Sequence, residues 1–227
     1  MKTILLLVRH GETVDNANKI MQGQTQGELN DTGVRQAEEL AAQMASTRID
    51  AIVASDLHRA IQTATIVAAP HGLEVVTTPM LRERDWGGFT GRYIPDLKDE
   101  VWPDDIETLE ALSERARKFL HFIKTHYEGK TVLAVGHGIV NKAIQAVHYG
   151  KQMREVERMN NCEIRTLELK RWLLSKWPPP RLAPELPPAA PALRVAFPAL
   201  RDTFPPPRLK CPLLERSALL VLPPPRL

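Results

Sequence analysis

The feature that most constrains the fold is an unbroken apolar run that stops at a charged turn. Residues 3–8 (TILLLV) lead directly into residues 9–13 (RHGET). A continuous aliphatic run without alternation is typical of a parallel strand covered on both faces. Ligands of open α/β sheets bind beyond the carboxyl ends of such strands. We therefore expect Arg9 and His10 to lie in a binding site, where Gly11 lets the backbone approach a ligand closely.

The same pattern recurs further along the chain. Residues 131–135 (TVLAV) stop at His137 in a Gly-His-Gly turn, and residues 51–54 (AIVA) lead to Arg59. Three strands would then deliver imidazole or guanidinium groups to one edge of a sheet. Two Arg and two His favour a dianionic tetrahedral ligand, because the guanidinium fork pairs bidentately with phosphate oxygens. The pattern predicts a phosphate site.

Four motifs occur together in a characteristic order: RHGET at 9–13 with Asn16, SDLHRA at 55–60, LRE at 81–83 followed by glycines at 87–91, and GHG at 136–138. In order and spacing they resemble the histidine phosphatase superfamily, the phosphoglycerate mutase-like proteins. The resemblance covers about residues 2–170. It implies a three-layer α/β/α fold with a mostly parallel sheet, and a phosphatase that uses a His nucleophile.

The resemblance also implies roles for single residues. His10 would be the nucleophile that forms a phosphohistidine, and Glu83 the proton donor. The phosphoryl group would be held by a set of polar residues and one glycine: Arg9, Gly11, Asn16, Gln22, Arg59 and His137. Gln22 could equally belong to an ordinary surface loop.

Glu83 has a second interpretation from the sequence alone, as an ion-pair partner of Arg82 or Arg84. Weaker candidates for the acid are three other carboxylates: Glu12, Asp56 and Asp85. A proton donor must start protonated, which a nearby phosphate dianion and partial burial favour. Both neighbouring arginines would oppose this, so we expect them to point away from the site.

The residues suit an in-line displacement at phosphorus. His10 would attack as a neutral imidazole, while Arg9, Arg59 and His137 neutralise the equatorial oxygens. Glu83 would protonate the leaving oxygen and later activate the water that hydrolyses the intermediate.

A metallohydrolase built on His10, His137 and nearby carboxylates is the competing enzyme class. Arg9 and Arg59 would repel a divalent ion, and the sequence has no closely spaced pair of His ligands. We therefore expect no metal and no other cofactor. Hydrolysis that persists in the presence of a chelator would favour the metal-free scheme over the metallohydrolase.

The reaction type is a finer question. Family mutases carry a long insertion between the acid and the second His, whereas only 53 residues separate Glu83 from His137. This favours a phosphatase that acts on small phosphorylated metabolites. The alternatives are a phosphoglycerate mutase-type phosphotransferase, a phosphoprotein phosphatase, and a phosphoryl-binding module, which would usually lose His10 or Glu83.

Hydrophobic periodicity outlines the remaining elements. We expect helices after an N-cap at Thr32 and over 57–69, 106–127 and 137–148, strands at 73–77 and 162–169, and a polar loop or short helix at 92–105 that reads the substrate. The other five His residues are expected to be on the surface or partly packed: His58, His71, His121, His126 and His148.

Composition divides the chain near Trp172. Of the 19 Pro, 15 follow residue 172, and the basic excess lies in the same part, so residues 1–172 form the predicted domain. No basic stripe on that domain suggests nucleic acid. No run reaches the roughly 18 apolar residues of a membrane span, and the short apolar start lacks a cleavage motif. With only Cys162 in the domain, a cytoplasmic location is expected; the oligomeric state is not readable.

Residues 173–227 repeat Pro-Pro-Pro-Arg-Leu three times. Such a Pro-rich, low-complexity segment predicts disordered or non-native chain, and the functional alternative is a ligand for Pro-binding domains. Removing it is expected to leave catalysis intact.

Overall fold

The computed structural model describes residues 2–170, so the Pro-rich tail and the predicted boundary at residue 172 lie outside the described residues. Five strands form one sheet in the order β3-β2-β4-β1-β5. They are β1 (Thr3–Arg9), β2 (Ala51–Ser55), β3 (Val75–Thr78), β4 (Thr131–Gly136) and β5 (Ile164–Leu169). The first four are parallel to one another, and β5 closes the edge beside β1 in the antiparallel direction. The predicted mostly parallel sheet is confirmed.

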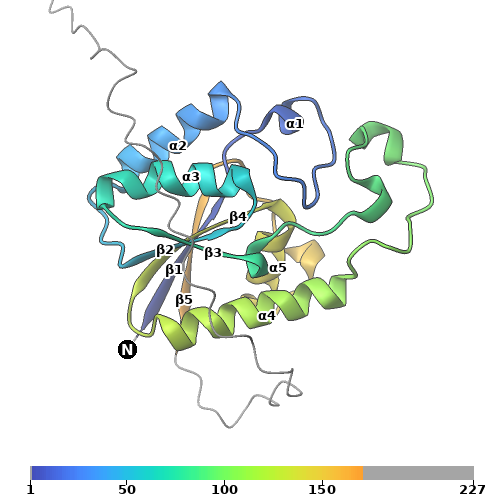
Figure 1. Ribbon diagram of the computed structural model, residues 1–227. Coiled ribbons are helices and arrows are strands. Elements are labelled where there is room, and N and C mark those ends of the chain that lie inside the picture. The colour runs from blue at the N-terminus through green and yellow to red at the C-terminus, as the bar shows by residue number, and fades with distance from the viewer. Residues whose placement is uncertain (1, 171–227) are drawn as a thin grey trace, which may run out of the picture. The chain divides into compact units, whose positions relative to one another are not determined.

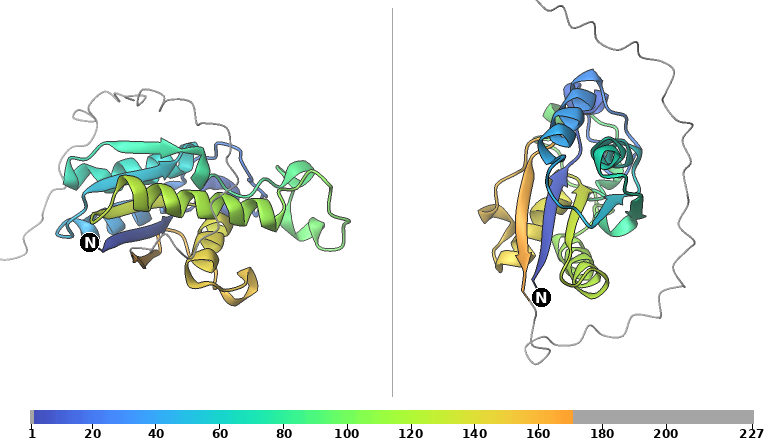
Figure 2. Two further views of the ribbon diagram at one scale, coloured as in Figure 1. Left: turned by 90° about the horizontal axis from the view of Figure 1, so that it is seen from below. Right: turned by 90° about the vertical axis from the view of Figure 1, so that its left-hand side faces the viewer.

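Helices cover both faces of this sheet (Figures 1 and 2). Leu5 and Leu7 of β1 pack in one core with α4 (Leu109–His126) and α5 (Gly138–Tyr149). Leu6 and Val8 face the opposite core, which α2 (Asp31–Met44) and α3 (His58–Ala68) complete. Because successive strand residues point to opposite faces, the unbroken apolar run of β1 supplies both cores. The predicted three-layer architecture is confirmed.

Side-chain caps fix where two of these helices begin. The Asn30 side chain accepts a hydrogen bond from the Gly33 N–H (2.8 Å), so the N-cap of α2 lies two residues before the predicted cap at Thr32. Thr108 caps α4 by accepting from the Ala111 N–H (3.1 Å). Both positions follow the general preference for short polar side chains at helix N-caps. Asn30 was missed because Thr32 fits the same preference.

The segment between β3 and α4 is built from short 3₁₀ turns, the last of which lies in the loop or short helix predicted at 92–105. They are η2 (Pro79–Leu81), η3 (Gly87–Phe89) and η4 (Ile94–Leu97). A small separate cluster of Phe89, Leu97 and Ile106 holds this segment together. Two further turns, η1 (Ala69–His71) and η5 (Met153–Glu155), and a short helix α1 (Val14–Ala17) complete the elements. None of the helices in residues 2–170 is long and apolar enough to cross a bilayer.

Candidate active site

Strand register brings two imidazoles together. β1 and β4 pair side by side with Arg9 opposite Gly136, so His10 and His137 are the next residues on the two strands. The His10 N–H donates to the Gly136 carbonyl (3.0 Å). The two ring centroids lie 5.0 Å apart, and both side chains are buried. The sheet ladder therefore sets the distance between the two predicted catalytic histidines.

The His10 ring is held in one tautomer. Its Nδ1 lies 2.7 Å from the Gly11 carbonyl oxygen, which can only accept, so Nδ1 carries the hydrogen and Nε2 keeps a lone pair. Burial, then the charges of Arg59 and Arg9, hold the pKa of His10 well below its ordinary value. His10 is therefore a neutral imidazole near pH 7 with its Nε2 available for attack.

His137 is held in the opposite tautomer. The Nε–H of Arg59 donates to its Nδ1 (3.1 Å), so the hydrogen of this ring lies on Nε2. Burial and then the charge of Arg59 hold the pKa of His137 well below its ordinary value. Within residues 2–170, the buried Nε2 has no hydrogen-bond partner. One ring thus offers a lone pair and its neighbour offers a donor.

Arg59 projects from the first turn of α3 and is almost completely buried. Besides His137, its guanidinium donates to the carbonyls of Gly23 (2.8 Å), Thr25 and Gln26 (3.2 Å). Together, these three carbonyls and the imidazole accept hydrogen bonds from four of the five N–H hydrogens of the guanidinium. The sequence did not suggest the loop carbonyls as partners. Burial lowers its pKa to about 10, so the group stays charged at neutral pH. Among residues 2–170 nothing accepts the second Nη2 hydrogen, which can therefore donate to a ligand.

Arg9 is the second buried guanidinium. Its Nη1 donates to the Met159 carbonyl (2.8 Å), and its buried Nε has no partner among residues 2–170. Burial, followed by the charge of Arg158, lowers the pKa of Arg9 to about 10. Two permanent cations therefore flank the imidazole pair.

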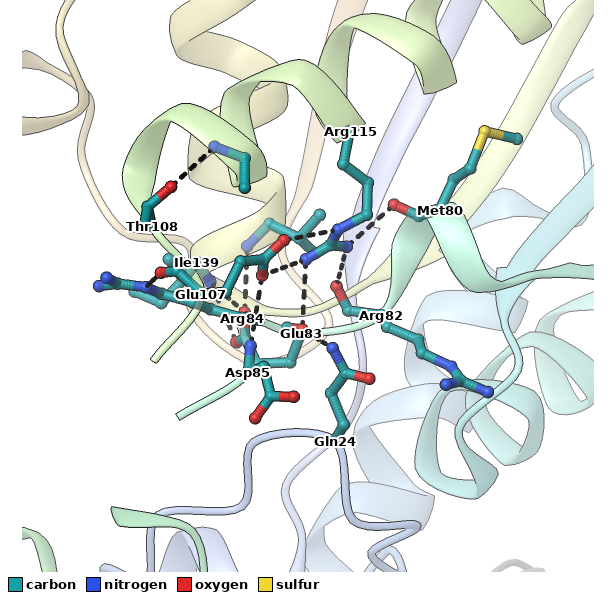
Figure 3. Close-up of polar contacts among 12 residues, drawn as sticks. Gln24, Met80, Arg82, Glu83, Arg84, Asp85, Glu107, Thr108, Arg115 and Ile139 are labelled. Atoms are coloured by element: carbon teal, nitrogen blue, oxygen red, sulfur yellow. Dashed lines mark hydrogen bonds and ion pairs between the residues drawn. The ribbon is translucent and has the colours of Figure 1, made fainter. Parts of the chain in front are cut away.

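Glu83 lies against the first turn of α5 (Figure 3). Its carboxylate accepts hydrogen bonds from the backbone N–H groups of Ile139 (3.1 Å), Val140 (3.1 Å) and Arg84 (2.8 Å). Helix N-termini attract carboxylates in this way because their first N–H groups lack partners within the helix. Because α5 starts directly after His137, the helix joins the predicted acid to the second histidine.

Both arginines beside Glu83 are engaged elsewhere, as predicted. Arg82 forms an ion pair with Asp56 (2.6 Å), and the Arg84 Nε donates to the Glu107 carbonyl (2.7 Å). The Arg84 guanidinium also lies 4.7 Å from the ring centroid of Trp86. The interpretation of Glu83 as an ion-pair partner of either neighbour is therefore wrong.

The weaker acid candidates have other partners. Glu12 accepts from the Asn30 side-chain amide (2.7 Å), Asp56 pairs with Arg82, and Asp85 accepts from the Gly87 N–H (2.9 Å). Glu83 is the one of the four that lies beside the His137 turn.

Asn16 lies close to the nucleophile turn. Its Oδ1 accepts from the Thr13 N–H (3.3 Å) and from the Asn161 Nδ2 (3.4 Å), which leaves its own Nδ2 hydrogens to donate. The same Asn161 amide donates to the His10 carbonyl (2.9 Å). Asn161 was missed from the sequence because a lone Asn before a Cys carries no motif.

Gln22 and Gly11 have mainly structural contacts. The buried Gln22 donates to the Thr13 hydroxyl (2.7 Å). The Gly11 N–H donates to the Thr63 hydroxyl (3.0 Å), and a Cβ on Gly11 would lie 2.5 Å from the Gly33 carbonyl oxygen. Gly11 therefore lets α2 pack on the turn. The predicted approach of a ligand to its backbone stays a prediction.

Arg115 of α4 is a further residue that sequence reasoning missed. It donates to the carbonyls of Met80 (3.1 Å), Arg82 and Glu83 (3.4 Å) and pairs with the Glu107 carboxylate (2.6 Å), as Figure 3 shows. One guanidinium thus fixes the backbone that carries Glu83. A signal was present, because Arg115 lies three residues after the buried Leu112 and so falls on the inward stripe of the helix.

A protein metal site needs several His, Cys, Asp or Glu side chains close together. In the part of the chain that the structure describes, no three His, Cys, Asp or Glu side chains lie together in a group that could hold an ion. The cations that lie beside the imidazoles are Arg9 and Arg59.

Comparison with known proteins decides the family. Residues 5–176 match the model of the histidine phosphatase superfamily, branch 1. This chain belongs to the histidine phosphatase superfamily. Curated relatives include two proteins named "Probable phosphoglycerate mutase GpmB". The one from Enterobacter sp. (strain 638) is 34% identical over 75% of this chain and 88% of the relative, and the one from Yersinia enterocolitica is 34% identical over 76% and 89%.

Solved structures extend the comparison for this histidine phosphatase. Phosphoserine phosphatase from Entamoeba histolytica, in complex with 3-phosphoglyceric acid, is 28% identical with a TM-score of 0.65, over 72% of this chain and 89% of that one. Bacillus stearothermophilus YhfR is 28% identical with a TM-score of 0.68, over 74% and 92%. The family and the fold agree with the sequence motifs, and the chain is an enzyme of the phosphatase type.

Proposed function

We propose that this histidine phosphatase hydrolyses small phosphorylated metabolites without a metal, through a phosphohistidine on His10. The observation that carries the proposal is the pair of opposite tautomers. His10 offers a lone pair at Nε2, and His137 offers a hydrogen at Nε2 from a ring 5.0 Å away. A nucleophile beside a fixed donor is what attack on a phosphoryl group requires.

In the first half of the proposed reaction, the His10 Nε2 forms a bond to phosphorus while the ester oxygen leaves. Charge on the equatorial oxygens is met by Arg9, by the remaining Nη2 hydrogen of Arg59 and by the Nε2–H of His137. The Asn16 amide lies close enough to the same turn to add a donor.

Glu83 serves both halves of the reaction. In the first half, the Glu83 carboxyl gives its proton to the leaving alkoxide. The resulting carboxylate, held by the N–H groups of α5, then takes a proton from the water that attacks the phosphohistidine. Phosphate and free His10 are the products, and the proton returns to Glu83.

Phosphatase rather than mutase is supported by the length of the segment between the acid and the second histidine. Only 53 residues separate Glu83 from His137, which leaves no room for a long insertion over the site. Named phosphatases occur among the structural neighbours, and the named mutases among the curated relatives keep the phosphotransferase as the second candidate.

The decisive experiment measures phosphate release from a panel of phosphomonoesters in the presence of a chelator. The intact chain is compared with His10→Ala and with a control, His121→Ala, which removes an exposed imidazole of α4. We expect turnover that the chelator does not change, that the control retains and that His10→Ala abolishes. Loss of turnover on chelation would overturn the metal-free scheme. Transfer between phosphoglycerates without net hydrolysis would favour the mutase.

We further infer a cytoplasmic location. The predicted domain has a single cysteine, the free thiol Cys162, and so few cysteines suit a reducing compartment.

A further inference from the structure

Arg158 is a cation at the active site that the proposed reaction does not use. A Cβ on Gly138 would lie 3.3 Å from the Arg158 Nε and 3.6 Å from the Glu83 Oε2, so the guanidinium and the carboxylate share one small patch beside the start of α5. Arg158 also acts on the phosphate-binding groups, because its charge is the second cause, after burial, of the lowered pKa of Arg9.

The backbone around Arg158 is fixed. Val156 and Met159 on either side are buried, and the Met159 carbonyl accepts the hydrogen bond from Arg9. The Arg158 side chain itself is exposed. Within residues 2–170 no carboxylate or carbonyl accepts a hydrogen bond from it. An anchored, solvent-facing guanidinium is therefore available at the rim of the site.

We propose that Arg158 binds a carboxylate carried by the alcohol part of the substrate. The inference rests on the proposed function, in which Glu83 protonates the ester oxygen. The alcohol must then lie beside Glu83, so a substituent one or two carbons from the ester oxygen reaches Arg158. A single guanidinium matches the single charge and the two oxygens of a carboxylate. The substrate class is thus phosphomonoesters of small hydroxy acids.

A matched pair of substrates tests this assignment. 3-Phosphoglycerate and glycerol 3-phosphate share one ester and a three-carbon chain, but only the first carries a carboxylate. We expect Arg158→Gln to lower kcat/KM for 3-phosphoglycerate by about 10- to 100-fold, the usual worth of a hydrogen bond to a charged group. Glycerol 3-phosphate should change little. Arg158→Lys should recover part of the loss, and Arg154→Gln, an exposed arginine four residues earlier, should change neither.

Three results would overturn the assignment. Equal losses on both substrates would mean that Arg158 acts on Glu83 or on the phosphoryl group. No loss on either would mean that it touches no substrate. If Arg158→Gln lowered kcat/KM most for glycerol 1,3-bisphosphate, the group that Arg158 binds would be a second phosphate and not a carboxylate. Failure of the proposed function looks different, since the intact chain would then hydrolyse neither ester or His10→Ala would remain active.

Discussion

The Nε–H of Arg59 lies 3.1 Å from the Nδ1 of His137, so one guanidinium sets the tautomer of the second imidazole. The rest of the same group holds the carbonyls of Gly23, Thr25 and Gln26. Arg59 therefore couples the α3 turn, the loop at 23–26 and the donor at the end of β4. Its substitution affects more than the charge of the site.

Arg59→Lys keeps the positive charge but loses the planar fork. We expect kcat to fall about 100-fold, the usual cost of one donor at a developing oxyanion. Nitrogen NMR of the His137 ring should show the hydrogen on Nε2 in the parent protein and a mixture of tautomers in the variant. Arg117→Lys, on the exposed face of α4, is the matched control. Unchanged turnover and an unchanged ring spectrum in Arg59→Lys would contradict this role.

Glu83→Gln removes the proton donor but keeps the size of the side chain. Alkyl phosphates need a proton on the leaving oxygen, so we expect a loss of about 10²- to 10⁴-fold. An activated aryl phosphate such as p-nitrophenyl phosphate should lose far less. Glu114→Gln, on the exposed face of α4, serves as the control. An equal loss on alkyl and aryl esters would rule out Glu83 as the acid.

The free energy of unfolding should decrease as the pH is lowered, because of the two buried imidazoles. Their folded-state pKa values lie well below the unfolded value of about 6.5, so below pH 6.5 the unfolded chain binds more protons. Above that pH they contribute no dependence. Below it, the free energy of unfolding should fall by up to about 1.4 kcal/mol per pH unit for each ring, down to the folded pKa values.

Urea unfolding at pH 7.5, 6.5 and 5.5 measures this dependence. The double variant His10→Asn, His137→Asn should have a flatter profile between pH 6.5 and 5.5. His121→Asn, which removes an exposed ring, should retain the parent slope. The same slope in the double variant would show that other groups cause the acid sensitivity.

Arg115→Met tests how the Glu83 segment is held. The change removes the cationic partner of the Glu107 carboxylate and the Arg115 hydrogen bonds to the Met80 and Glu83 carbonyls, so we expect a loss of about 3 kcal/mol in the free energy of unfolding. Activity on alkyl phosphates should fall more than activity on aryl phosphates, because a misplaced acid matters most for poor leaving groups. Arg115→Lys should restore part of both. If Arg115→Met lowered stability and reduced activity equally on alkyl and aryl phosphates, Arg115 would have no role in positioning Glu83.

The sequence predicted the fold because the strands that matter are unbroken apolar runs. β1 and β4 were recognised with their ends, and both runs stop at the histidines that the register brings together. Local signals near helix starts were less decisive, since Asn30 and Thr32 both suit a cap and only the backbone geometry distinguishes them.

The residues of the site that belong to sequence motifs were predicted to lie together. Arg9, His10, Arg59 and His137 lie together, and Glu83 lies beside His137. Arg158 and Asn161 were missed because they are single residues in a loop, and only the folded chain places them next to β1 and α5. The loop carbonyls that Arg59 holds carry no sequence signal at all, because every residue has one.

The pairing of Arg9 with Gly136 has a consequence for how the molecule loses activity. The two imidazoles extend a ladder between the central strands, whose amides are expected to exchange with solvent only when the whole domain opens. The spacing of the histidines should then persist through fluctuations at the rim, such as opening of the segment at 92–105. Inactivation in denaturant should follow global unfolding of the sheet, and the same transition should release amide protection in β1 and β4.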